Sequence, residues 1–148
     1  MRIHSLLQLL GATALLATLV AGCTAVAETP AQAESTTPRV FFTSPQDGAT
    51  VSSPVQVTMA AENFVVEPAS DAVVEGHGHL HIMVDTGCIE PGQGIPKDET
   101  HLHYGQGQLE AALDLAPGEH TLCLQAADGL HVALAGEGMT QMIRVTVE

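Results

Sequence analysis

Histidines spaced two residues apart are the feature of this sequence that could do chemistry. His79 and His81 form one such pair, His101 and His103 form another, and His131 follows further along the chain. Along a β-strand, residues i and i+2 lie on the same face with Cα atoms roughly 6.5–7 Å apart. Each pair can therefore direct two imidazole nitrogens toward one ion, at the bond length of about 2 Å that zinc adopts with histidine. The spacing predicts a metal site formed by these five histidines.

Three further residues are secondary candidates for the same site. His77 and Met83 have the strand parity of the first pair, although Gly76 and Gly78 favour a strand that begins after His77. His120 stands at the start of a predicted strand, with the parity of the core. Ligand sets made of imidazole alone suit Cu(II), zinc and nickel, with copper highest in the Irving–Williams order, and Met83 would add a soft ligand for Cu(I). We expect copper first and zinc second as the bound cofactor.

The composition excludes several other classes of function. Lys and Arg total 4 against 17 Asp and Glu, which gives the 148-residue chain a formal net charge of −13. No basic patch is available to replace the counterions of a nucleic acid, so we expect no nucleic-acid partner. Aromatic residues make up 3% with no Trp, too few for a platform on which bases stack. The acidic charge instead favours a cationic ligand.

Residues 1–22 are typical of an export signal, with a positive charge ahead of an apolar stretch that ends in small residues. Val20-Ala21-Gly22-Cys23 resembles the lipobox of bacterial lipoproteins, in which the cysteine is lipidated and becomes the new N-terminus. We therefore expect a protein of the bacterial cell envelope, anchored through lipid on Cys23 in the outer membrane and facing the periplasm. Residues 23–37 would form a flexible tether. The alternative is an ordinary secretory signal in which Cys23 is incidental.

The two remaining cysteines, Cys88 and Cys123, form an even pair in an exported domain. Exported proteins fold in an oxidising compartment, so a disulfide between the two is the expectation. This bond would close a loop of about 35 residues and stabilise the fold by about 3–4 kcal/mol. The alternative is that one of the two thiolates is a metal ligand.

Short alternating segments separated by turns must position these side chains. In residues 79–84, Leu80, Ile82 and Val84 share the face opposite the histidines, and in residues 120–126 two leucines face inward. Four further segments are predicted strands: 39–43, 55–59, 108–115 and 142–147. Turn signals separate the segments, and no amphipathic helix is evident. Residues 38–148 are therefore expected to fold as one all-β domain, an immunoglobulin-like antiparallel β-sandwich of about seven strands.

Five blocks of this region resemble a family of small secreted bacterial domains, the domain of unknown function 4399 family. The blocks are RVFFTSPQDG at 39–48, a His-rich strand ending in VDTG at 84–87, IPKDETHLHYG at 95–105, LDLAPGEHTL at 113–122 and QAADGLH at 125–131. The resemblance implies that six histidines fall on family histidine positions: His79, His81, His101, His103, His120 and His131. Leu80, where the family is expected to carry a third consecutive histidine, departs from the pattern, and so does the cysteine pair. The family brings no established activity.

These observations predict a lipid-anchored, monomeric metal-binding protein of the cell envelope, acting in storage, delivery or sensing. One alternative is a non-catalytic interaction module that contacts an envelope protein without metal, with the histidine pairs more than about 10 Å apart, too far for one ion. A second alternative is a copper-dependent dismutase, because the pattern from His79 to His101 is similar in part to copper–zinc superoxide dismutases. No nucleophile elbow of the Gly-x-Ser-x-Gly type is present, and we expect no enzymatic activity.

Overall fold

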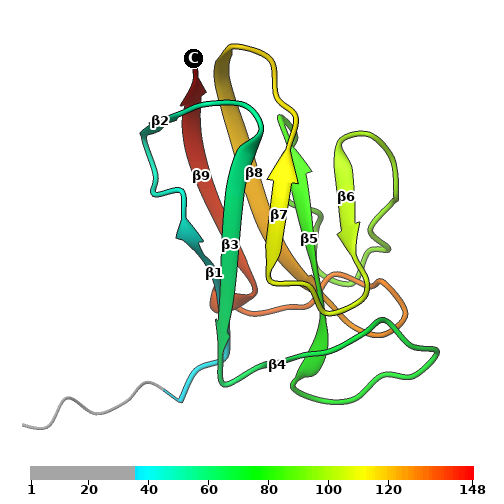
Figure 1. Ribbon diagram of the computed structural model, residues 1–148. Helices are drawn as coiled ribbons and strands as arrows, with labels where there is room; N and C mark the ends of the chain where they lie inside the picture. The colour runs from blue at the N-terminus through cyan, green and yellow to red at the C-terminus, as the bar shows by residue number, and fades with distance from the viewer. Residues whose placement is uncertain (1–35) are drawn as a thin grey trace, which may run out of the picture. The chain divides into compact units, whose positions relative to one another are not determined.

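The computed structural model describes residues 36–148, which form two β-sheets packed face to face (Figure 1). The described strands are β1 (Arg39–Ser44), β2 (Ala49–Val51), β3 (Val55–Glu62), β4 (Val65–Val66), β5 (His77–Val84), β6 (His101–Tyr104), β7 (Glu110–Leu113), β8 (Gly118–Ala127) and β9 (Thr140–Val147), and a short 3₁₀ helix, η1 (Glu137–Met139), precedes β9. The expected signal peptide, Cys23 and most of the tether lie outside the described residues. Within residues 36–148, no helix is long and apolar enough to cross a membrane.

One sheet has three strands in the order β1-β3-β7, and the other follows the order β2-β9-β8-β5-β4, with β6 also paired to β5. The pairings are antiparallel except for β2 with β9 and β4 with β5, which are parallel. The prediction of an all-β sandwich is confirmed. The short strands β2, of 3 residues, and β4, of 2 residues, bring the described strands above the expected seven.

The main core lies between the two sheets and is built from alternate residues of each strand. Val55, Val57 and Met59 of β3 face Leu80 and Ile82 of β5 across the sandwich, and all five are buried. Burying a side chain of this size contributes about 1.5–3 kcal/mol relative to leaving it exposed. The predicted inward parity of residues 80, 82 and 84 is therefore confirmed, and it leaves the histidines of β5 on the other face of the sheet.

Gly78 does not interrupt β5, so the expected early break of this strand is wrong. The strand begins at His77 and continues through Gly78, which is buried and pairs with Val66 of β4. A Cβ atom at this position would overlap the carbonyl oxygen of Ala127. Glycine is needed here because the end of β8 approaches the backbone of β5 closely. The regular strand geometry consequently extends past His79.

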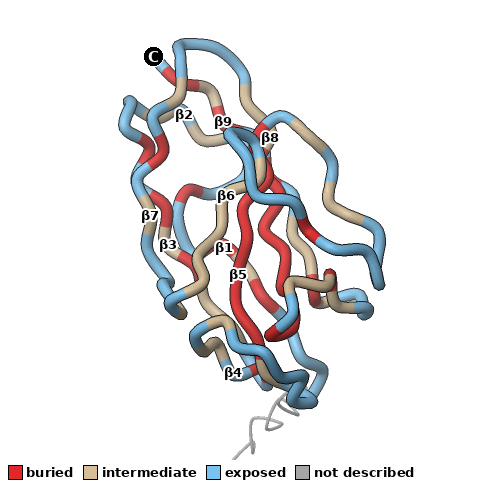
Figure 2. The backbone as a smooth tube through the Cα atoms, turned by 90° about the vertical axis from the view of Figure 1, so that its right-hand side faces the viewer, coloured by how far each residue is buried: buried red, intermediate tan, exposed pale blue. Residues whose placement is uncertain are grey.

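The outer face of β5 is buried as completely as its inner face. Every residue from Gly78 to Val84 is buried, and Figure 2 shows the strand as a continuous buried stretch. A second, smaller apolar cluster includes Met83 and Cys123 of the sheet together with Ile95 and Ala133. These last two residues belong to the loops that follow β5 and β8, so the loops cover the strand on its outer side. The histidines of β5 therefore lie between the sheet and these loops.

Candidate metal centre

Four imidazole rings come together on the outer side of β5. His79 and His81 belong to β5, His103 belongs to β6, and His131 lies in the loop after β8. Every pair of ring centroids among these four lies between 4.6 and 5.9 Å apart. The Nε2 atoms of His79 and His81 are 3.0 Å apart, as are those of His103 and His131. One ring nitrogen from each of His79, His81 and His103 lies within 4.8 Å of the other two.

Strand register brings three of these rings together. In the antiparallel pair of β5 with β6, His103 stands directly opposite His81, and directly opposite residues have Cβ atoms about 4.5–5.5 Å apart. His79 is two residues further along the same face of β5. On its other side it faces Ala127 of β8, whose small side chain leaves room for a ring above it.

A tight turn at the end of β8 brings the fourth ring, that of His131, to the cluster. The buried carboxylate of Asp128 accepts hydrogen bonds from the backbone N–H groups of Leu130 at 2.9 Å and Val132 at 3.0 Å. His131 itself has a φ of 66°, in the left-handed region that non-glycine residues seldom occupy. Such a conformation costs about 1–3 kcal/mol and persists only where the surroundings impose it, most often at functional sites. Here the hydrogen bonds of Asp128 to the residues on either side help to impose it.

Close packing against Gly105 fixes the position of the His103 ring. A Cβ atom on Gly105 would overlap the Cε1 and Nε2 atoms of the His103 ring, which packs over the glycine backbone. A side chain at this position would push the ring nitrogen away from the cluster. The residue is therefore a positioning residue for His103, although it follows β6 and carries no chemistry of its own.

Burial favours the neutral form of three rings in this cluster, those of His79, His81 and His103. Burial, together with repulsion from His131 and His103, lowers the pKa of His79 to about 4, against an opposing effect of Asp128. Burial and repulsion from the neighbouring rings lower the pKa of His81 to about 3. The pKa of His103 is also lowered, by burial first and then by His131 and Lys97. Neutral imidazoles carry the lone pairs that metal ions bind, so these ligands need not lose a proton near neutral pH.

The hydrogen bonds within the cluster leave polar atoms unpaired. A neutral imidazole has one N–H and one lone pair, so each contact between two Nε2 atoms requires one donor and one acceptor. The Nδ1 atoms of both His79 and His81 are buried with no hydrogen-bond partner in the described part of the chain. A cation among the rings would remove the need for Nε2 donors, because every Nε2 could then offer its lone pair to the ion while Nδ1 carries the hydrogen. Tetrahedral binding with bonds of about 2.05 Å separates the nitrogens by roughly 3.3–3.4 Å. The Nε2 pairs of His79 with His81 and of His103 with His131, each 3.0 Å apart, are close to this spacing.

Comparison with known protein families shows to which family the chain belongs. The model of the family described as "Domain of unknown function (DUF4399)" matches residues 57–148, which is more than half of the 148-residue sequence. The chain belongs to the DUF4399 family. No curated protein and no solved structure matches it. The predicted family is thereby confirmed over residues 57–148, which include four of the five sequence blocks and all four clustered histidines, while the block at 39–48 lies outside the match.

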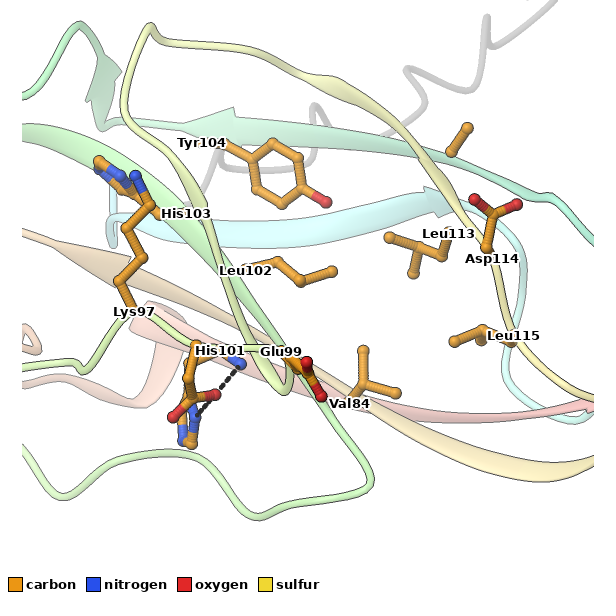
Figure 3. Close-up of a pocket in the computed structure, with 12 residues that line it drawn as sticks. Val84, Lys97, Glu99, His101, Leu102, His103, Tyr104, Leu113, Asp114 and Leu115 are labelled. Atoms are coloured by element: carbon orange, nitrogen blue, oxygen red, sulfur yellow. Dashed lines mark hydrogen bonds and ion pairs between the residues drawn. The ribbon is translucent and has the colours of Figure 1, made fainter.

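His101, predicted as one of the five metal ligands, lies outside the four-ring cluster. It stands opposite Met83, and its Nδ1 donates to the carboxylate of Asp98 at 2.8 Å. Its ring lines a cleft of about 430 Å³ between β6 and the end of β7. Figure 3 shows His101 and His103 at separate places on the wall of this cleft, with Lys97 running toward His103. Of the second histidine pair, only His103 therefore belongs to the cluster.

The secondary candidates are also engaged outside the four-ring cluster. The Nδ1 of His77 lies 3.0 Å from the carboxylate of Glu67. His120 donates from Nδ1 to Asp85 and from Nε2 to the carbonyl oxygen of Ala116, both at 2.8 Å. Met83 is fully buried in the smaller apolar cluster with Cys123. The structure thus gives these three residues packing and pairing roles.

Cys88 and Cys123 are joined by a disulfide, with their Cα atoms 5.6 Å apart. The expectation of a bond between them is confirmed, against the alternative that one is a free thiolate ligand. Sequence reasoning missed Gly105 and the role of Asp128 in holding His131. The Asp128-Gly129 turn signal marked the right place for a tight turn, but nothing in the sequence indicated which side chain the turn would present.

Proposed function

We propose that this DUF4399 domain binds one transition-metal ion through His79, His81, His103 and His131, with copper preferred over zinc, in storage, delivery or sensing at the cell envelope. The observation that carries the proposal is the convergence of ring nitrogens from His79, His81 and His103, which lie within 4.8 Å of one another, with the Nε2 of His131 3.0 Å from that of His103. The metal-free alternative expected the histidine pairs to lie more than about 10 Å apart, whereas the rings of His79 and His103 are 4.9 Å apart.

The depth of the cluster supports reversible binding. His79 and His81 are fully buried, whereas His103 and His131 are partly exposed. An ion can therefore arrive from solvent at the two outer rings and be held by the two inner ones. A site with ligands at two depths suits a protein that takes up an ion and passes it on.

The charge of the molecule supports a cationic ligand. The chain carries a formal net charge of −13, and a field of this sign raises the local concentration of cations. Asp128 acts in the same direction within the site, because its negative charge favours positive charge at His79. The net charge of the protein and the imidazole nitrogens of the cluster therefore both favour a metal cation as the bound species.

The donor set supports Cu(II) or zinc over Cu(I). All four candidate ligands are imidazoles, which suit Cu(II), zinc and nickel, and copper binds most tightly in the Irving–Williams order. Met83, which could have supplied a thioether, packs in the apolar cluster with Ile95 and Cys123. The expected lipid anchor on Cys23 and the tether over residues 23–37 would hold such a site at the outer membrane, facing the periplasm.

Metal titration tests the proposal. At pH 7.5 the purified protein should bind one equivalent of Cu(II) or zinc by isothermal titration calorimetry, and replacing His79 and His81 together with Ala should abolish this binding. His77→Ala is the matched control, because His77 lies on the same strand but contacts Glu67, and it should leave the affinity unchanged. Affinity weaker than tens of micromolar in the wild type would overturn the proposal. A superoxide-consumption assay of the copper-loaded protein tests the enzymatic alternative.

A further inference from the structure

The loop that carries His131 is hydrogen-bonded to the loop that follows β5. The backbone N–H of Ile95 donates to the carbonyl oxygen of His131 at 2.8 Å. One step further on, Ala133 and the loop exchange two hydrogen bonds: Ala133 donates to Gln93, and Gly92 donates to Ala133, both at 2.9 Å. Residues 88–95 and 131–133 thus form a two-stranded strip over the outer face of β5, which we call the outer strap.

The outer strap is fastened to the sheet at one end by the disulfide. Cys88 begins the strap, and its partner Cys123 lies in the middle of β8, directly opposite Met83 of β5. Beside the disulfide, the buried side chain of Gln125 makes two hydrogen bonds to the backbone of Ile89. Its Oε1 accepts from the N–H at 2.8 Å and its Nε2 donates to the carbonyl oxygen at 2.7 Å. A continuous series of bonds therefore leads from the disulfide to His131.

The other three rings of the cluster do not depend on this strap. His79, His81 and His103 stand on β5 and β6, which are held by their own strand pairing and by the main core. Only His131 comes from a loop, and its left-handed backbone requires support from its neighbours. The His131 loop is also bonded to the end of β8, where Asp128 donates to Val132 and Leu134 donates to Ala126, both at 3.0 Å. Loosening the strap would therefore leave the sheet and this turn in place but remove the bond from Ile95 that holds the backbone of His131.

We infer that the Cys88–Cys123 disulfide positions His131, so that the metal affinity of the site depends on the oxidation state of this bond. The inference rests on the proposed metal-binding function and adds its regulation. Cys88 is partly exposed and Cys123 is fully buried, so an external dithiol would attack the sulfur of Cys88. The exchange breaks the protein disulfide and forms that of the reagent. Two electrons and two protons pass from the dithiol to Cys88 and Cys123, which become thiols.

A double-mutant cycle tests the coupling. Zinc affinity is measured by competition with a chromophoric chelator for four proteins: the oxidised wild type, C88S/C123S, H131A and the triple variant. Serine removes the bond without adding thiolates that would themselves bind zinc. The disulfide variant should lose about 10–100-fold in affinity, the range seen when residues that orient ligands are removed. In the H131A background the same replacement should change the affinity by less than about twofold.

Two results would overturn the inference: unchanged affinity in C88S/C123S, or an equal loss with and without His131. If the serine variant does not fold, the folded wild type is reduced under native conditions and its thiols are blocked with iodoacetamide. Amide hydrogen exchange should then accelerate at Ile95 and Ala133 while the β5 and β6 amides stay protected, and retained protection at Ile95 would refute the coupling. If the oxidised wild type binds no zinc or copper at all, the proposed function fails rather than this coupling.

Discussion

The two histidine pairs have the same spacing but end in different surroundings. His79 and His81 both enter the cluster and are fully buried, whereas of the second pair only His103 enters it and His101 binds Asp98. The difference arises across the strand interface, where His103 is opposite His81 and His101 is opposite Met83. Spacing of two residues places side chains on one face of a strand, but the neighbouring strand decides whether they meet.

The deep burial of the first pair should make the metal-free protein sensitive to acid. In the unfolded chain, histidine binds a proton below a pH of about 6.5, whereas folding lowers the pKa of His79 to about 4 and of His81 to about 3. Between these limits the unfolded state holds more protons, so stability falls as the pH falls. With a chelator present, the free energy of unfolding should drop by roughly 2–4 kcal/mol from pH 7 to pH 5, measured by urea denaturation.

The matched control for this experiment is H79Q/H81Q, which removes the two buried imidazoles and keeps polar side chains in their place. Its unfolding free energy should change far less over the same interval. Asp and Glu titrate mainly below this window, so they contribute little to the slope. An unchanged slope in the variant would show that other groups cause the acid sensitivity and that the two rings are accessible to protons in the folded state.

The two members of the second pair should differ sharply in their effect on metal affinity. Replacing His103 by Ala removes one of the four proposed ligands and should weaken zinc binding by at least about 100-fold, because losing a ligand should cost no less than losing a residue that only orients one. Replacing His101 by Ala breaks its hydrogen bond to Asp98 and should change the affinity by less than about threefold. Competition titration at pH 7.5 measures both. Equal losses in the two variants would mean that the ion lies between these side chains and not among the four rings.

The sandwich itself could be predicted because its signal is local. Alternation in residues 79–84 fixes which side chains of β5 face the core, and the same parity puts both histidines of that strand on the opposite face. The short parallel strands β2 and β4 could not be predicted, since strands of 3 and 2 residues carry no periodicity. The fold class therefore followed from the pattern, while the exact strand set depended on tertiary packing.

The site was harder to predict because two of its determinants act through the backbone. Gly105 matters only because the His103 ring packs on it, and the left-handed turn that presents His131 is held by Asp128 together with the bond from Ile95 of the outer strap. For His101 a local signal did exist. Asp98 stands three residues before His101 and accepts hydrogen bonds from both the ring and the backbone N–H of His101. This local hydrogen-bonded motif competes with metal binding for the His101 ring.

A substitution at Gly105 tests whether the position of the His103 ring is what makes His103, and not His101, a metal ligand. Gly105→Ala introduces a methyl group where the ring now lies, so the ring must move and zinc affinity should fall about tenfold. Gly87→Ala is the control, because a Cβ atom at this exposed position meets no neighbouring atom. Competition titration compares the two. An unaffected Gly105→Ala variant would show that His103 can reach the ion from another rotamer.

His120 contrasts with the cluster, because its pairing favours the charged form. Hydrogen bonds to the carbonyl oxygen of Ala116 and to Asp85 raise the pKa of His120, so its contribution to stability is complete below a pH of about 6.5 and is lost as the pH rises through the raised value. Asp85 is half-exposed and solvent screens the pair, so His120→Gln should cost less than about 1 kcal/mol at pH 6. Thermal unfolding at pH 6 and pH 9 should show a smaller cost at pH 9, opposite in sign to the acid sensitivity of His79 and His81. A cost that grows with pH would mean that His120 is held neutral, like the clustered rings.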